Sequence, residues 1–176
     1  VFDDLPKKGL ITWSAMISEY AQHGEGLRSL SLFYQMQRWG IEPDSVTLSS
    51  LLKACSSIES MFQGNIVYSY AIEMGYDTSI IVGNALIDMY HKCNDLDETW
   101  QTFSQVSKPD CVTWNSIISA FIEDDLSFAL FNQMLQNGIM PDQITFLTLT
   151  SACASQAMLG IGKQIHARII SESKMN

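Results

Sequence analysis

The sequence predicts an all-α fold of stacked helix pairs, and three observations support that prediction. The stretch from Ile11 to Tyr20 returns at Val112 to Phe121, and a looser copy runs from Ile81 to Tyr90. Pro-Asp pairs recur at 43–44, 109–110 and 141–142, each followed by one residue, then Val or Ile, then Thr. No strand-like alternation of apolar and polar residues persists beyond a few positions. Self-similarity at a period of roughly 30 to 36 residues indicates a solenoid, whose units are stable only when stacked.

These markers divide the chain into repeating units, each expected to hold two helices joined by a turn. Residues 1–9 are interpreted as the end of a preceding unit. The following units are predicted at 10–44, 45–79, 80–110, 111–142 and 143–176, the last of them incomplete. Because the chain begins inside a unit and shows no targeting segment, we interpret it as part of a longer protein.

In the first unit, apolar residues at helical spacing, among them Trp13 and Ile17, predict a first helix over about residues 12–22. The breaker at 23–26 ends this helix. A second helix then presents Leu27, Leu30, Phe33 and Met36 on one face. Gly40 is placed for a left-handed cap after this helix, and Pro43 cannot continue it.

The second and third units repeat this plan. In the second unit the second helix is predicted at 61–74, with Gly75 as its stop. The third unit is shorter, with a turn at 92–95 and a second helix that ends before Pro109.

The fourth and fifth units depart from the first in length. From Trp114 to Phe131 there are three residues fewer than from Trp13 to Phe33. We therefore expect a tight turn at 123–125 and a shortened second helix, predicted at 126–137. The fifth unit begins at Gln143, and its second helix is predicted at about 159–171, which gives ten helices in all.

Composition narrows the possible functions. No run of 18 apolar residues occurs, so no membrane span is expected. The formal net charge of −9 argues against nonspecific binding of polyanions, which needs Lys and Arg. The four cysteines form no Cys-x-x-Cys pair, a pattern that suits free thiols in a reducing compartment. His91 and Cys93 are too few for a zinc site, so no metal is expected.

Two helical repeat families have about this period. Trp13, Met16 and Tyr20 fit the tetratricopeptide pattern by spacing, but Ile17 and Ser29 stand where that pattern has Gly and Ala. The chain instead resembles the pentatricopeptide repeat family throughout, through the segments at 32–44, 112–119 and 131–142. Units of 35, 35 and 31 residues resemble the plant class that cycles standard, long and short repeats. The segments at 82–93 and 162–167 are similar to its short and long repeats.

This resemblance implies a right-handed α-solenoid that binds single-stranded RNA in a mitochondrion or chloroplast, as part of an RNA processing or cytidine-to-uridine editing factor. It also implies that the long repeats engage accessory proteins of the editing machinery. The deaminase signature pairs His-x-Glu with Cys-x-x-Cys. The chain lacks this paired signature, so we expect no enzyme activity, cofactor or small-molecule substrate. The alternative is a protein-binding α-solenoid scaffold of tetratricopeptide type, which an acidic surface would also suit.

The resemblance assigns the second residue of each unit to a flat, non-polar wall against the base. These residues are all β-branched and stiff at χ1, and they are Ile11, Val46, Ile81, Val112 and Ile144. The alternative is that each is simply a core residue.

The fifth and last residues of a unit read the base edge, by the same resemblance. Ser14 with Asp44 matches the combination associated with guanine. Asn84 with Asp110 and Asn115 with Asp142 match that associated with uracil, with cytosine second. An amide can donate and accept on a base edge, whereas Asp only accepts. The alternative is that each Asp caps the next helix, and both roles can hold together.

The remaining positions are expected to contribute little. Ser49 with Ser79 gives an ambiguous pair, and Leu147 has no polar group. Lys92 stands where the family's Lys contacts phosphate. Its counterparts in the other units carry no positive charge, and they are Gln22, Ser57, Glu123 and Ser155. This lack of positive charge predicts weak binding of RNA.

Overall fold

The computed structural model describes residues 9–122 and 126–155, and every regular element within them is an α-helix. The predicted turn at 123–125 and the predicted helix at 159–171 lie outside the described residues. The chain forms two compact units, Val1–Val106 and Ser107–Asn176, called here the N-terminal and C-terminal units. The first contains α1 (Leu10–Gln22), α2 (Gly26–Arg38), α3 (Ser45–Ser57), α4 (Met61–Glu73), α5 (Ile80–Lys92) and α6 (Leu96–Gln105). The second contains α7 (Cys111–Ala120), α8 (Leu126–Gln136) and α9 (Gln143–Ser155).

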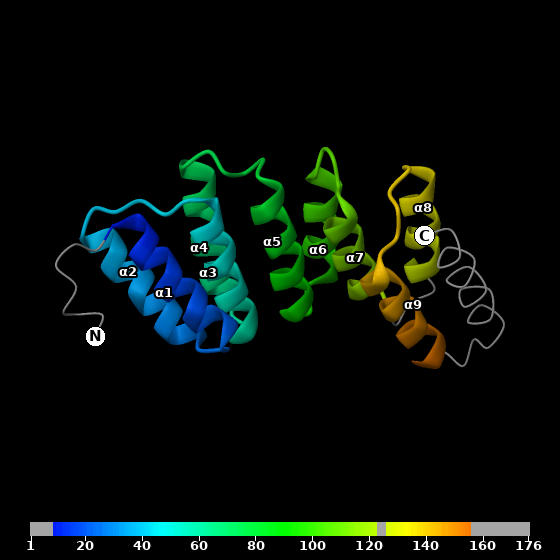
Figure 1. Cartoon of the computed structure of the whole chain (residues 1–176), viewed down its shortest axis with the longest axis horizontal. Coiled ribbons are helices and arrows are strands. Elements are labelled where there is room, and N and C mark those ends of the chain that lie inside the picture. The colour runs from blue at the N-terminus through cyan, green and yellow to red at the C-terminus, as the bar shows by residue number, and fades with distance from the viewer. Residues whose placement is uncertain (1–8, 123–125, 156–176) are drawn as a thin grey trace. The chain divides into compact units, whose positions relative to one another are not determined.

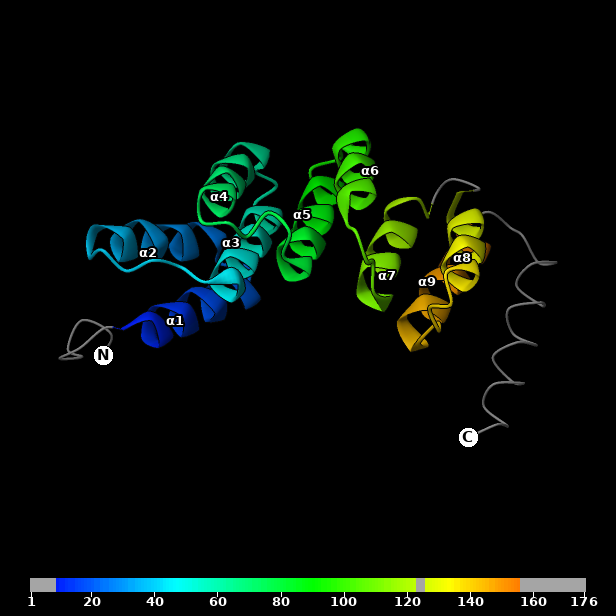
Figure 2. The same ribbon diagram turned by 90° about the horizontal axis from the view of Figure 1, so that it is seen from above.

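In the N-terminal unit the helices pair as hairpins and form two rows. Figure 2 shows the first helices of the hairpins, α1, α3 and α5, in one row and the second helices, α2, α4 and α6, in another. Within the first row α1 contacts α3 and α3 contacts α5 (Figure 1). Each second helix packs on the first helix of its own hairpin, and α2 and α4 also contact the next first helix. The side chains of one hairpin therefore complete the core of its neighbour, as expected for a solenoid.

The core of this unit lies between the two rows. Its apolar side chains recur at helical spacing on the inner faces, and the largest fully buried ones are Trp13, Ile17, Phe33, Met36, Leu48, Leu51, Leu52, Leu86 and Met89. Gly26 opens α2 against the end of α3, and a Cβ at this position would clash with the carbonyl oxygen of Ala54. A side chain at position 26 would therefore push the first hairpin away from the second.

Local signals fix most helix ends. Asp44, Ser60 and Asp95 each cap a helix by accepting a hydrogen bond from a backbone amide in its first turn. Gly40 and Gly75 follow α2 and α4 with φ of 67° and 75°, a left-handed conformation that other residues adopt at a cost. The glycine caps predicted from the sequence are thereby confirmed at these two helices.

The C-terminal unit is a helical hairpin with a third helix packed on it. Both α8 and α9 contact α7, and its core holds Trp114, Ile117, Ile118, Leu130, Phe131, Met134 and Leu149. α7 has 10 residues, whereas α1, α3 and α5 have 13 each. We expected the missing residues in the turn or at the start of the second helix. Because α7 already ends at Ala120, part of the shortening falls in the first helix instead.

Candidate nucleic-acid interface

The five proposed wall residues are not core residues. Each stands second in the first helix of a hairpin, and their exposed fractions run from 47% for Ile81 to 85% for Ile11. Val46, Val112 and Ile144 fall between these values. Since a core side chain is almost fully buried and about half or more of each of these is exposed, the interpretation as core is wrong for all five. Their role against a base stays a prediction.

The first reading pair is joined through a third residue, Thr47. The Asp44 carboxylate caps α3 by accepting a hydrogen bond from the Thr47 amide at 2.8 Å. The Thr47 hydroxyl donates to the same Asp44 oxygen at 2.6 Å. Ser14, which comes from α1, meets the Thr47 hydroxyl at 2.6 Å. The structure therefore brings Ser14 and Asp44 together through Thr47, which is fully buried.

The fourth reading pair is joined directly as well as through a threonine. Asn115 of α7 donates from Nδ2 to Asp142 Oδ1 at 2.9 Å. Thr145 donates from its hydroxyl to Asn115 Oδ1 at 2.5 Å. Asp142 Oδ1 also accepts from the Thr145 amide at 2.9 Å, which caps the start of α9. The cluster is closed, because every polar atom of the Asn115 side chain has a partner.

These contacts favour the ionised form of Asp142. Burial by itself would raise the pKa of the Asp142 carboxyl. The hydrogen bonds from the Thr145 amide, the Asn115 amide, the Thr145 hydroxyl and the Cys111 thiol outweigh this effect and lower that pKa below its ordinary value. Burial and the neighbouring Asp142 carboxylate in turn raise the pKa of Cys111. At neutral pH the site therefore holds a carboxylate beside a protonated thiol.

The two residues of the third pair, Asn84 and Asp110, belong to different compact units. Asp110 caps α7 by accepting from the Thr113 amide at 2.8 Å, and its own amide donates to the Thr113 hydroxyl oxygen in return. This reciprocal pairing is a capping box. Asn84 is half-buried on α5 in the N-terminal unit. The alternative role, in which all three Asp residues cap the next helix, is confirmed. Base reading by the same residues stays a prediction.

The second pair forms no such cluster. The Ser49 hydroxyl donates to the Val46 carbonyl of its own helix at 2.9 Å. Ser79 precedes α5 without a capping side-chain hydrogen bond. The residue at the place of Thr47 is Val82, which is fully buried and has no hydroxyl. The ambiguity expected of this pair therefore has a structural counterpart.

Lys92, proposed to contact phosphate, is held by an acidic neighbour. Its ammonium lies 3.1 Å from Asp88 Oδ2. The same oxygen accepts a hydrogen bond from Ser56 at 3.1 Å. Asn84, Asp88 and Lys92 are four residues apart, so they follow one face of α5. Lys92 is exposed, but a phosphate would have to compete with Asp88 for it.

The buried threonines were missed as site residues, although the sequence carried their signal. Thr47, Thr113 and Thr145 each stand three residues after the Asp of a Pro-Asp pair. That regular spacing served only to mark the repeats. Nothing in the spacing tells which hydroxyl would reach the fifth residue of the preceding unit, since this depends on how the first helices pack.

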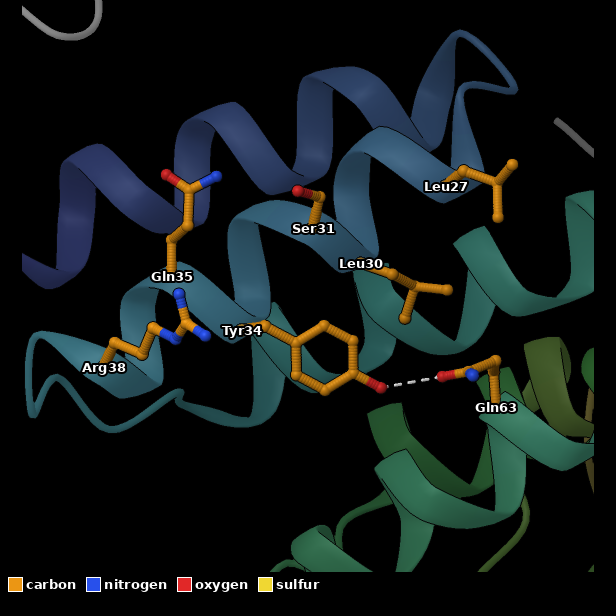
Figure 3. Close-up of a pocket in the computed structure, with 7 residues that line it drawn as sticks. All are labelled: Leu27, Leu30, Ser31, Tyr34, Gln35, Arg38 and Gln63. Atoms are coloured by element: carbon orange, nitrogen blue, oxygen red, sulfur yellow. Dashed lines mark hydrogen bonds between the residues drawn. The ribbon is translucent and has the colours of Figure 1, made fainter.

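A groove lies among the second helices of the N-terminal unit, with a volume of about 440 Å³. Figure 3 shows Gln63 of α4 across from residues along one face of α2, which are Leu27, Leu30, Ser31, Tyr34, Gln35 and Arg38. The Tyr34 hydroxyl donates to Gln63 Oε1 at 2.8 Å across the groove. Arg38 makes no ion pair with any described residue, and it supplies the positive charge of this groove.

The described residues contain no group of three or more His, Cys, Asp or Glu side chains that could hold a metal ion. His23 and Glu25 do stand in His-x-Glu spacing, but they lie in the turn between α1 and α2. No helix in the described part of the chain is long and apolar enough to cross a membrane.

Comparison with known families settles the relationship of the chain. The model of the PPR repeat family matches residues 8–57 and 109–155, which is more than half of the chain. The chain belongs to the PPR repeat family. The match covers the units with Ser14 and Asn115, together with the three Asp caps.

The relatives are plant PPR proteins. A mitochondrial pentatricopeptide repeat-containing protein of Arabidopsis thaliana is 35% identical over 193 residues, covering 97% of this chain and 21% of that protein. The chloroplastic pentatricopeptide repeat-containing protein CRR2 of Arabidopsis thaliana is 33% identical over 170 residues, covering 94% of this chain and 26% of that protein. The chain thus spans about a quarter of the length of these PPR relatives.

Solved structures confirm the all-α solenoid class. The crystal structure of the pentatricopeptide repeat protein PPR10 in complex with an 18-nt psaJ RNA element matches with a TM-score of 0.77 at 19% identity, covering 99% of this chain and 26% of that one. PPR10 is a maize protein. The PPR domain of Arabidopsis thaliana protein-only RNase P 1, in complex with tRNA, matches with a TM-score of 0.68 at 12% identity, covering 90% of this chain and 88% of that one.

Proposed function

We propose that this chain binds single-stranded RNA, one base per repeat, within an organellar RNA processing or cytidine-to-uridine editing factor. The observation that carries the proposal is the recurring site at the start of the first helices. There an exposed β-branched residue stands beside a hydrogen-bonded polar pair, as in Val46 next to the Ser14–Thr47–Asp44 cluster. Two PPR relatives named as mitochondrial and chloroplastic, and two fold neighbours crystallised with RNA, support the proposal.

The chemistry of these sites suits a single base. A flat aliphatic side chain covers the base face, and side-chain oxygens and amides meet its edge. In the order of the chain, the first unit takes guanine and the second is unspecified. The third and fourth take pyrimidines, with uracil preferred. This order follows the standard, long and short repeats that the sequence indicates, with the amino end of the chain at the 5′ end of the RNA.

The test of RNA binding uses the exposed wall. The triple variant Ile11→Ser, Val46→Ser, Ile81→Ser removes apolar side chains of which about half or more is exposed, so we expect the fold to persist. We expect it to weaken binding of a labelled single-stranded RNA by about tenfold or more, because base stacking is lost. The matched control exchanges three exposed residues in or directly after the second helices, Trp39→Ser, Phe62→Ser and Ile72→Ser, and should leave binding unchanged. Equal loss in both variants would contradict the proposal.

The groove on α2 supports a second function, docking of an accessory protein of the editing machinery. Its occupant would be an extended segment with an apolar residue for Leu27 and Tyr34 and a carboxylate for Arg38. Charge complementarity argues for the carboxylate, since Arg38 has no acidic partner among the described residues.

Two peptides that differ only in Asp versus Asn beside an apolar run test this docking. The Asp peptide should bind more tightly to the wild-type chain, and this difference should vanish in Arg38→Gln. Arg28→Gln, which instead breaks an exposed ion pair to Glu25, is the control. An Asp preference that survives Arg38→Gln would rule out the groove.

A further inference from the structure

Each Pro-Asp pair is followed by a threonine whose side chain is fully buried at the start of a first helix. Thr47, Thr113 and Thr145 all have an exposed fraction of 0%. The hydroxyls of Thr47 and Thr113 donate to the Asp that caps the same helix, at 2.6 and 2.9 Å, and that of Thr145 lies 3.0 Å from Asp142 Oδ1. A cap needs only the backbone amide of this residue. The hydroxyl is therefore available for a further role.

At the first site the threonine fixes the direction of a hydrogen bond. A hydroxyl carries one hydrogen, and that of Thr47 is directed at Asp44 Oδ1. The 2.6 Å contact with Ser14 must then have Ser14 as the donor. Ser14 is left with lone pairs only, so it can accept from a base but not donate to it. Together with the Asp44 carboxylate it presents an all-acceptor surface, which matches the donor groups on the edge of guanine.

At the fourth site the threonine orients an amide. Thr145 donates to Asn115 Oδ1, while Asn115 Nδ2 donates to Asp142. A flipped carboxamide would place its oxygen against the Asp142 carboxylate, so only one orientation is satisfied. Nδ2 also donates its second hydrogen to the Cys111 sulfur, with 3.7 Å between nitrogen and sulfur. Sulfur is a weak acceptor. A carbonyl oxygen of a pyrimidine would accept that hydrogen better than the sulfur does.

The second unit gives the comparison within the same chain. There Val82 replaces the threonine, Ser79 replaces the Asp, and Ser49 bonds to its own helix. The fifth residue bonds to the threonine of the following unit at the first and fourth sites, and bonds to its own helix at the second, where the threonine is absent.

We propose that Thr47 and Thr145 are positioning residues of the base-reading sites, which set whether the fifth residue of the preceding unit donates to or accepts from the base. This inference rests on the proposed RNA binding and deepens it. The reading site of a unit thus includes a residue of the next unit that touches no base.

The experiment measures relative affinity for RNAs that differ at one base. Thr47→Val keeps the shape of the side chain but frees the Ser14 hydrogen for donation. We expect it to lower the preference for guanine over uracil at the first base by about tenfold and to leave the fourth base unaffected. Thr145→Val should lower the preference for uracil over guanine at the fourth base by a similar factor and leave the first base unaffected. Each variant is thus the control for the other.

Two further variants separate positioning from stability. Thr145→Ser keeps the hydroxyl and should retain the wild-type preference. Thr148→Val removes a hydroxyl on the same helix that bonds only to the Ile144 carbonyl, and should also retain it. If Thr145→Val does not fold, Thr145→Cys replaces it, because a thiol fills the space and donates only weakly.

The outcomes distinguish this inference from the proposed function. If the wild-type chain discriminates between bases and both valine variants keep its ratios, the positioning role is overturned and RNA binding stands. If the valine variants weaken all RNAs equally, the threonines act on stability alone, which also overturns it. A wild-type chain that binds no single-stranded RNA overturns both.

Discussion

In the proposed RNA interface, the side chain of Asp88 competes with phosphate for Lys92. It accepts from Ser56 and pairs with Lys92, both at 3.1 Å. Exposed ion pairs contribute about 0 to 1 kcal/mol. A phosphate that binds Lys92 must therefore overcome a weak attraction to the Asp88 carboxylate. Lys92 is the only cation among the residues that we assign to the RNA.

Asp88→Asn tests this competition. The amide still accepts from Ser56 but no longer holds Lys92 by charge. We expect RNA affinity to rise by about two- to fivefold and the salt dependence to steepen by about 0.7 in log–log slope, the value for one phosphate contact on a single strand. Salt-titrated fluorescence anisotropy measures both. In a Lys92→Gln background the same change should have little effect, and an equal gain there would show a general charge effect instead.

The proposed base preference of the third unit is testable at one residue. Asn84→Thr replaces an amide by a hydroxyl. The third unit then resembles the first, in which Ser14 is paired with Asp44. We expect the preferred third base to move from pyrimidine to guanine, by about tenfold to a hundredfold in relative affinity. Competition binding with the unit placed in a longer repeat array measures this. A preference that stays at uracil would show that Asn84 does not read the base.

At the scale of elements, the short α7 is the unusual feature. It has 10 residues and its partner α8 has 11, against 13 in both α1 and α2. Fewer turns leave less apolar surface to bury between the two helices. We expect the amides of α7 and α8 to exchange faster with solvent than those of α1 and α2, as measured by hydrogen–deuterium exchange. Stronger protection of α7 would show that its capping box compensates for the lost length.

The start of α9 should depend on pH. The pKa of Asp142 is lowered in the folded chain, so its ionised form stabilises the fold. This contribution is complete above the pKa of an unfolded Asp, about 3.9, and is lost as the pH falls through the lower folded pKa. We expect the melting temperature of wild type to fall on acidification through this range more than that of Asp142→Asn. Parallel pH profiles would assign the acid sensitivity to other groups.

How far the sequence predicts these elements depends on how local their signals are. Gly40 and the Asp caps act within one helix turn, so spacing alone indicated both, with capping as one of two roles left open for the Asp residues. Whether Ile11 was core or wall could not be decided, because an apolar residue at the start of a helix suits either until its neighbours are placed. The hydroxyl of Thr47 reaches Ser14 across 33 positions of the chain. No local pattern contains that contact.

For the whole molecule, the number of reading sites limits the affinity. Three sites at about 1 to 3 kcal/mol of stacking each give roughly 3 to 9 kcal/mol, while association costs about 4 to 15 kcal/mol. We expect a micromolar or weaker dissociation constant for this chain at physiological salt, in keeping with its net charge of −9. Anisotropy titration measures it. A nanomolar value would mean that further contacts exist.

The Asp residues cap helices and are also proposed to read bases, and this combination has a consequence for how such a chain can diverge. Asp142 holds both the start of α9 and the Asn115 side chain, and removal of a helix cap costs about 1 kcal/mol. By the proposed base reading, a mutation at the last residue of a unit therefore alters target choice and weakens the fold in the same step, whereas one at Ser14 leaves the cap in place. New RNA targets should accordingly be acquired first through the fifth residues. Descendants of one array would then share their Asp residues and differ in the side chains that face them.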